Sequence, residues 1–417
     1  MLAIPPARLF SLHETYGNQK LILLPSTTLA HLASFTAIHS FLKPPSRRTQ
    51  FITFSARFPN HQHTHYQVQK TQTAPVMKTY LSYSFILAAA ASSLATGQTA
   101  YTTPVGYVSL GDNTAGQPAI KAGTDSAISI PLNRATEFAG EVASVTATTI
   151  TVSGSPAWAT APQQWAPNAD TPYLISICSG TENGFVGLIT SNTANTLTIQ
   201  SVTMGSLTNV AATDKVKIYK AWTLITLFPS GTFTPGVRLF GFSGITAGIN
   251  LAPDLNYLWN GTNWTKSGVI SNKIILYSGE SFFVRTLATA AVQSLTISGE
   301  VPTSNSRTII DKITAGVAQD TRLAYISPVD EPIGSSGLSS KLTPGDRLFG
   351  FNSATAGINK APSDNVLWNG TNWTLSGAIV NTTYTLKSGK GYFVRRLASA
   401  PVGSADWKDQ PSYIPSL

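Results

Sequence analysis

Paired tryptophans are the residues whose type and spacing best suit a binding role. Trp259 and Trp264 flank the stretch Asn-Gly-Thr-Asn, and Trp368 and Trp373 flank an identical stretch. Exposed indole rings stack on sugar rings, which would make a carbohydrate-binding platform. Buried rings would instead form a hairpin core. This second interpretation is favoured because each hairpin offers few other large side chains to cover a core.

The elements that must position these rings are short β-hairpins. In the stretch 260–263, glycine at the first central position of a two-residue loop suits a type II′ turn. A four-residue loop would keep the same symmetry. Either turn places Trp259 opposite Trp264, and Trp368 opposite Trp373, as cross-strand aromatic pairs.

The hairpins belong to a longer repeat. Residues 234–268 recur 109 positions later as residues 343–377, and 26 of the 35 positions are identical. A match this dense predicts a duplicated structural unit.

The sequence pattern changes in the region before the first repeat. Between 137 and 221, alternating strand-like runs occur at 141–145, 149–152, 173–177, 185–189, 197–199 and 216–219. Short alternating strands separated by turns predict a small closed barrel, which leaves no exposed edge.

Spacing indicates that this barrel is an insertion. Pro131 ends an apolar run 103 residues before Thr234, whereas Pro328 ends a similar run only 15 residues before Thr343. The sequence therefore predicts an all-β protein of two homologous β units, the first interrupted by the barrel. Unit A would comprise residues 98–136 and 222–302, the inserted barrel residues 137–221, and unit B residues 303–417.

The N-terminal stretch differs from everything that follows. Residues 1–76 hold all six histidines and seven Lys/Arg but a single acid, Glu14. An organelle transit peptide and a metal-binding tract at 61–65 are alternative interpretations. We favour a spurious or disordered extension, with the true start at Met77.

A signal peptide is predicted at residues 77–97. A short basic segment is followed by an apolar run at 81–94, too short for a membrane span, and then by small residues. Cleavage would leave a chain starting at Thr96 or Gln98. We expect a secreted, periplasmic or cell-surface protein whose mature chain has no transmembrane helix.

The exported part resembles an uncharacterised family of secreted proteins from the Verrucomicrobia. The resemblance covers nearly all of residues 77–417. It is carried by a Thr-rich β section and by the elements Pro104-Val105-Gly106-Tyr107, Ile130-Pro131, residues 222–229, Ala-Gly-Ile-Asn and Asn-Gly-x-x-Trp. The resemblance implies that the protein is exported and has this order of segments, but it identifies no functional site.

Composition excludes several functions. After residue 97 there are 20 basic and 18 acidic residues, so no basic surface for nucleic acid is expected. That part has no histidine and one cysteine, Cys178, which rules out histidine catalysis and a cysteine–histidine nucleophile. We expect an inert, buried thiol, no metal site and no cofactor.

Three polar patterns have a plainer interpretation than a catalytic one. The adjacent acids Asp330 and Glu331 would suit glycoside cleavage, but a polar turn fits better because neighbouring strand residues face opposite ways. The stretch 389–391, Gly-Lys-Gly, is half of a phosphate loop and precedes a strand. The third pattern is a set of strand-end arginines, expected to form a solvated rim: Arg285, Arg395 and Arg396.

The sequence thus favours an exported, non-enzymatic β-protein with a structural or surface-interaction role and no catalytic residue. One alternative is a carbohydrate-binding module that uses Trp259, Trp264, Trp368 and Trp373. Another is a hydrolase or lyase that acts on polysaccharide. The expected partner is a cell-surface polysaccharide or protein, and no nucleic acid.

Overall fold

The computed structural model describes residues 51–57, 63–69, 104–111, 120–166, 171–291, 293–352 and 356–414. The chain divides into two compact units, Met1–Ala100 and Tyr101–Leu417. In the first unit, β1 (Phe51–Arg57) pairs antiparallel with β2 (His63–Gln69). The signal peptide predicted at 77–97 and the remainder of the predicted extension 1–76 lie outside the described residues.

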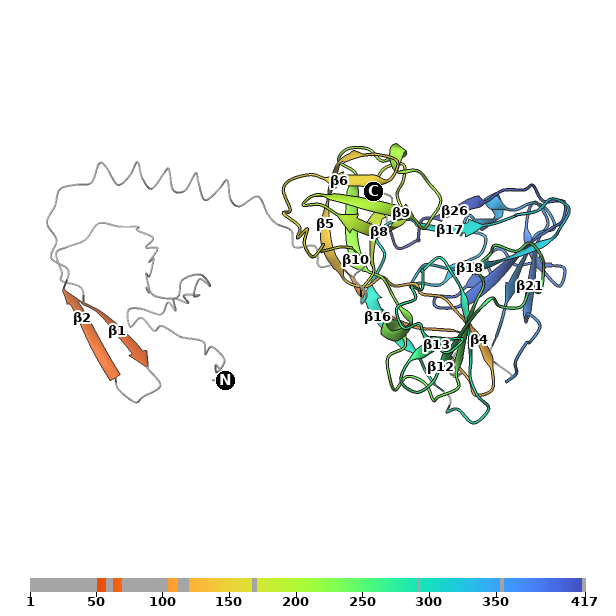
Figure 1. Cartoon of the computed structure of the whole chain (residues 1–417), viewed down its shortest axis with the longest axis horizontal. Coiled ribbons are helices and arrows are strands. Elements are labelled where there is room, and N and C mark those ends of the chain that lie inside the picture. The colour runs from red at the N-terminus through yellow and green to blue at the C-terminus, as the bar shows by residue number, and fades with distance from the viewer. Residues whose placement is uncertain are drawn as a thin grey trace. The chain divides into compact units, whose positions relative to one another are not determined.

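The predicted barrel is confirmed. Its strands close in the order β10-β5-β6-β9-β8-β7. They are β5 (Thr136–Val145), β6 (Thr149–Val152), β7 (Tyr173–Ile177), β8 (Val186–Asn192), β9 (Thr196–Ser201) and β10 (Lys215–Lys220), with a 3-10 turn, η1 (Leu207–Asn209), between the last two. Figure 1 labels five of them, β5, β6, β8, β9 and β10.

Alternation along the strands fills the barrel interior. On β6 and β9, every second residue is buried, so that Ile150 and Leu197 point inward while their threonine neighbours remain partly exposed. The indoles of Trp158 and Trp165 pack edge to face at 5.9 Å and join the same core. Closure gives each barrel strand two hydrogen-bonded neighbours, and this removes the edges that favour aggregation.

A six-stranded sheet follows the barrel in the chain and is called the first sheet. Its order is β14-β13-β12-β11-β15-β4. The strands are β4 (Asp125–Ile128), β11 (Arg238–Gly241), β12 (Leu255–Trp259), β13 (Trp264–Lys266), β14 (Val269–Ile270) and β15 (Phe282–Arg285). A one-turn helix, α2 (Leu224–Leu227), connects the barrel to β11.

The second sheet also has six strands, in the order β18-β25-β20-β21-β22-β23. They are β18 (Gln319–Ala324), β20 (Arg347–Gly350), β21 (Asp364–Trp368), β22 (Trp373–Leu375), β23 (Ala378–Ile379) and β25 (Gly391–Arg396). Arg238 lies between Leu258 and Arg285 in the first sheet, as Arg347 lies between Leu367 and Arg395 in the second.

Two-stranded ladders complete the described fold. β3 (Val105–Ser109) pairs with β16 (Thr296–Glu300), β17 (Ser306–Ile310) with β26 (Ala405–Asp409), and β19 (Glu331–Pro332) with β24 (Thr385–Leu386). The turn η2 (Leu338–Lys341) packs near β26. Among the described helices, none has the length and apolar character to cross a membrane.

Candidate functional site

The predicted tryptophan pairs form, and their rings lie in the cores. Trp259 is opposite Trp264 with ring centroids 5.6 Å apart, and Trp368 is opposite Trp373 at 5.5 Å. Trp259, Trp264 and Trp373 are 2 %, 0 % and 1 % exposed, and Trp368 is half-buried. A sugar-stacking platform needs open ring faces, so these rings in this conformation pack the two sheets instead.

The expected solvated rim of arginines is wrong. Arg285 donates from Nε and Nη2 to both oxygens of Asp125, at 2.6 and 2.7 Å. Arg395 does the same to Asp320, at 2.6 and 2.7 Å. The physical reason is strand register, which places each arginine directly opposite its aspartate.

The third arginine of that set is buried. The side chains of Arg396 and Asp346 are 4 % and 0 % exposed, and Arg396 Nε lies 2.9 Å from Asp346 Oδ2. A buried charge of this kind requires a partner, which the sequence did not reveal because Asp346 lies 50 residues away.

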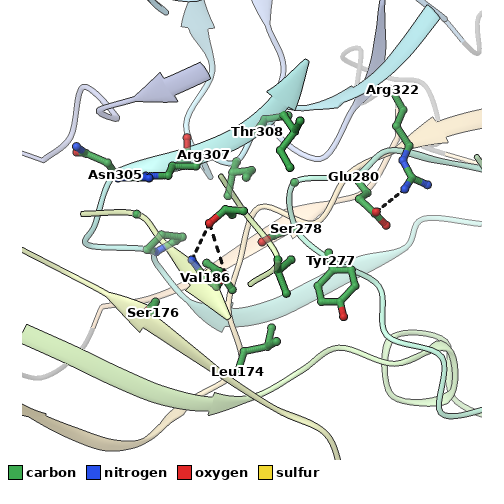
Figure 2. Close-up of a pocket in the computed structure, with 18 of the residues that line it drawn as sticks. Leu174, Ser176, Val186, Tyr277, Ser278, Glu280, Asn305, Arg307, Thr308 and Arg322 are labelled. Atoms are coloured by element: carbon green, nitrogen blue, oxygen red, sulfur yellow. Dashed lines mark hydrogen bonds and ion pairs between the residues drawn. The ribbon is translucent and has the colours of Figure 1, made fainter. Parts of the chain in front are cut away.

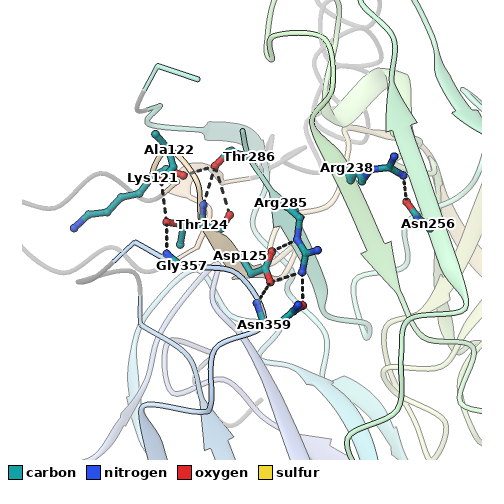
Figure 3. A network of polar contacts seen from close by, with 10 residues as sticks. All are labelled: Lys121, Ala122, Thr124, Asp125, Arg238, Asn256, Arg285, Thr286, Gly357 and Asn359. Carbon is teal, nitrogen blue, oxygen red and sulfur yellow. Dashed lines mark hydrogen bonds and ion pairs between the residues drawn. The ribbon is translucent and has the colours of Figure 1, made fainter. Parts of the chain in front are cut away.

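An asparagine from the opposite sheet completes each of the partly buried ion pairs Arg285–Asp125 and Arg395–Asp320. Asn359 follows β20 of the second sheet, yet its Oδ1 accepts from Arg285 Nη2 at 2.5 Å. Its backbone N–H donates to Asp125 Oδ2 at 2.7 Å. Gly357 adds a backbone bond, since its carbonyl accepts from Asp125 N at 3.1 Å. Figure 3 shows this set, which we call the Asn359 clamp.

An equivalent set of contacts connects an asparagine of the first sheet to the ion pair of the second sheet. Asn250, from the first sheet, accepts at Oδ1 from Arg395 Nη2 at 2.8 Å, and its N–H donates to Asp320 Oδ2 at 2.9 Å. This is the Asn250 clamp. Both asparagines end the repeated Ala-Gly-Ile-Asn stretch and have positive φ, 54° and 53°. Asparagine tolerates this left-handed conformation better than most residues.

A cavity of about 580 Å³ lies between the two clamps. Its floor consists of half-buried phenylalanines that occupy equivalent places in the two sheets: Phe242, Phe283, Phe351 and Phe393. The Phe283 and Phe393 rings stack at 5.8 Å, and each meets a further ring edge to face at 5.0 or 5.2 Å. We call this cavity the aromatic groove.

No family model, curated protein or solved structure matches this chain.

Apolar side chains surround the aromatic groove. Leu251 lines it and is exposed, and Ile249 beside it is 41 % exposed. In the second sheet, Ile358 is 52 % exposed just before the clamp residue Asn359. Exposed apolar residues scattered singly need no explanation, but here they gather beside an aromatic floor, as at interaction sites.

A smaller cavity of about 230 Å³ adjoins the aromatic groove. The two cavities share Phe242, Ser243, Gly244 and Asp320 in their walls. We call the smaller one the polar chamber, because Glu280, Arg322 and Thr308 line it. Figure 2 shows the Glu280 carboxylate turned toward Arg322, with which it forms an ion pair. Burial raises the pKa of Glu280, and the Arg322 charge opposes that rise.

Two polar atoms of the chamber have no partner among the described residues. They are Arg322 Nη1 and Thr308 Oγ1, both shielded from solvent. Buried polar atoms in native structures almost always have a partner, so such atoms in a cavity wall require an explanation. No sequence pattern indicates this chamber, because its residues come from the barrel, from loops of the first sheet and from β17 and β18.

The other candidate chemical patterns take structural roles. Asp330 pairs with Lys387 at 2.8 Å, whereas Glu331 is buried and accepts from Tyr325 Oη at 2.7 Å. Lys390 is 5 % exposed and lies 3.8 Å from the Asp364 carboxylate, just before β25 rather than before a helix. The described residues contain no cluster of three or more His, Cys, Asp or Glu suited to a metal ion.

Cys178 follows the barrel strand β7. Its side chain is half-buried, and its thiol lies 3.5 Å from Ser176 Oγ. Desolvation raises the pKa of this thiol, so less of it is thiolate at neutral pH.

Proposed function

We propose that this protein is an exported, non-enzymatic β-protein with a structural or surface-interaction role, and that the aromatic groove is its interaction site. The observation that carries this is the floor of four half-buried phenylalanines held between two equivalent clamps. Concave apolar sites with a few fixed polar groups are the usual form of a binding site.

The state of the charged groups favours binding over catalysis. Three carboxylates line the groove. Asp125 and Asp320 are each held by two nitrogens of an arginine, and the exposed Asp254 accepts from the Ser243 backbone N–H at 2.8 Å. A general acid and base need carboxyl groups with access to a substrate proton. Here the carboxylates and arginines satisfy one another and fix the walls of the groove.

The proposal includes export and duplication. The signal peptide predicted at 77–97 supports a secreted, periplasmic or cell-surface location, as does the resemblance to the Verrucomicrobia family. We further propose that unit A (98–136 and 222–302) and unit B (303–417) are copies of one ancestral unit, with 137–221 inserted in the first. The repeated sequence, the matching strand order and the reciprocal clamps support this.

Sedimentation with envelopes of the producing cells tests the role of the aromatic groove. Ala252 and Ala361 line the groove and are exposed, so Ala252→Trp or Ala361→Trp should fill it without disturbing the cores. Thr262→Trp, on an exposed hairpin turn, is the matched control. We expect the exported protein and the control to sediment with the envelopes, and both groove variants to lose at least about 90 % of that binding.

Two results would contradict the proposal. If the wild-type protein does not bind envelopes, the surface-interaction role is wrong. If the wild-type protein and the groove variants bind equally well, the interaction lies elsewhere on the molecule.

A further inference from the structure

We propose that the ligand is a neutral oligosaccharide whose rings lie on the aromatic groove while the hydroxyls of one ring enter the polar chamber. This rests on the aromatic groove being the interaction site. It names a ligand class and adds the polar chamber, which shares Phe242, Ser243, Gly244 and Asp320 with the groove.

Charge balance is the first reason. The ionisable residues that line the aromatic groove are three acids and three bases: Asp125, Asp254, Asp320, Arg285, Arg395 and Lys360. The arginines are paired with Asp125 and Asp320, Asp254 accepts from the Ser243 backbone at 2.8 Å, and Lys360 Nζ donates to Asn352 O at 2.9 Å. A charged ligand that bound either arginine or either of their aspartates would have to break an ion pair, whereas a neutral ligand leaves both pairs intact.

The unpartnered atoms of the polar chamber are the second reason. Arg322 Nη1 is a donor only, whereas Thr308 Oγ1 both donates and accepts. A sugar hydroxyl also donates and accepts, so it has the chemistry to pair with a donor nitrogen, with a hydroxyl or with a carboxylate such as that of Glu280. Satisfying buried polar atoms gives more affinity than an exposed contact, because leaving them unmatched costs free energy.

The shape of the floor is the third reason. Sugar rings have apolar C–H faces and polar edges, and the floor offers ring faces and edges of phenylalanine. Clamp amides at Asn250 and Asn359 stand beside it. A chamber of about 230 Å³ admits a single sugar ring rather than a larger group. The polar contacts would then select the terminal ring, and the aromatic floor would hold the next ones.

Calorimetric titration of the exported protein with defined oligosaccharides tests this. The panel contains neutral gluco-, manno-, galacto- and xylo-oligosaccharides, sulfated and uronic-acid oligosaccharides, and a neutral apolar peptide. We expect binding of at least one neutral oligosaccharide and none of the anionic oligosaccharides or the peptide.

Thr308→Val tests the contribution of the polar chamber alone, because valine has nearly the same shape as threonine but lacks the unpartnered oxygen. We expect affinity for the oligosaccharide to fall about tenfold while the melting temperature stays the same or rises. Thr265→Val is the control: Thr265 is buried on β13 and donates to Leu258 O at 3.3 Å. That variant should lose some thermal stability and keep its affinity.

The outcomes separate this inference from the proposed function. If envelopes bind in a groove-dependent way but only an anionic oligosaccharide or the peptide binds in calorimetry, the ligand class is wrong and the function stands. If no panel member binds while envelope binding persists, the proposal that the ligand is a neutral oligosaccharide is also wrong. If Thr308→Val keeps full affinity, the polar chamber has no part in binding. Loss of all envelope binding would contradict the proposed function itself.

Discussion

At the scale of single residues, hydrogen bonds let the two indoles of the first sheet be buried as well as paired, whereas the buried Trp373 Nε1 of the second sheet has no partner among the described residues. Trp259 Nε1 donates to Phe233 O at 3.0 Å, and Trp264 Nε1 to Phe228 O at 3.4 Å. Because these N–H groups have partners, the rings can lose their contact with water at little polar cost. Hairpin register places the two rings opposite each other, and the backbone carbonyls that accept from their N–H groups allow them to be buried.

We predict unequal costs for truncating equivalent tryptophans. Trp259 is 2 % exposed, whereas Trp368 is half-buried. Trp259→Ala should lower the free energy of unfolding by about 3–5 kcal/mol, and Trp368→Ala by clearly less. Urea unfolding of both variants measures this. A larger loss for Trp368→Ala would mean that the burial of these rings does not set their contribution.

Protonation of Asp409 should affect the stability of the fold. It is 4 % exposed on β26, and its Oδ2 has no partner among the described residues. Burial, and next the nearby Glu331 carboxylate, raise the pKa of Asp409 to about 7. In the unfolded chain the same group titrates near a pKa of about 3.9. Between these values the folded protein holds a proton that the unfolded chain releases.

We therefore predict that stability falls as pH rises. The contribution of Asp409 is fully present below about pH 4 and is lost as pH rises through about 7, by at most about 4 kcal/mol. The melting temperature should be higher at pH 5 than at pH 8, and Asp409→Asn should flatten that difference. Asp330→Asn, at an exposed ion pair, is the control. An unchanged pH profile in Asp409→Asn would contradict the assignment.

At the scale of elements, one arginine of β17 connects that strand to the barrel. Arg307 on β17 is 2 % exposed. It donates from Nη1 to Met204 O at 2.9 Å and from Nη2 to Thr181 O at 3.2 Å, and it lies 2.7 Å from the Glu182 carboxylate. The residues contacted belong to turns between barrel strands, so β17 is fixed to the barrel through a buried charge.

We predict that Arg307→Met costs about 3–5 kcal/mol, because it leaves the buried Glu182 carboxylate without its partner. Adding Glu182→Gln should recover part of that loss, since the uncompensated charge is then removed. A double-mutant cycle by chemical denaturation measures the coupling. Strictly additive effects of the two substitutions would show that the ion pair does not connect the barrel to β17.

The barrel strands were predictable from sequence, but the contacts between sheets were not. Alternation and turn residues mark the runs at 149–152 and 173–177, because each strand interior faces one core. The partner of Arg285 could not be read, because Asp125 lies 160 residues away and outside the repeated stretch. The repeated Ala-Gly-Ile-Asn was visible, yet only the fold shows that each asparagine reaches the opposite sheet.

At the scale of the whole molecule, the proposed export requires a defined N-terminus for the chain that leaves the cell. We predict that exported protein starts at Thr96 or Gln98, because the run 81–94 and the small residues after it have the pattern of a signal peptide. Intact-mass analysis of the exported fraction measures this. Recovery of peptides from residues 1–76 in that fraction would contradict it.

The candidate site could not be predicted as a whole from the sequence. Tryptophans stood out because of their spacing, whereas two of the groove phenylalanines lie within β15 and β25 and the other two directly follow β11 and β20. Phe242 and Phe351 lie in the repeat, but the same pattern would suit core residues. Their half-buried state depends on how the two sheets meet, and no local pattern encodes that contact.

Hydrogen–deuterium exchange of the exported protein, with and without envelopes of the producing cells, is the most direct test of the central claim. The aromatic groove is predicted to be where the partner binds. Added envelopes should therefore slow exchange in residues 243–251 and 356–360, which carry the clamps and the exposed aliphatic side chains. Protection confined to the barrel or to the hairpin turns at 260–263 and 369–372, with the groove loops unchanged, would contradict the claim.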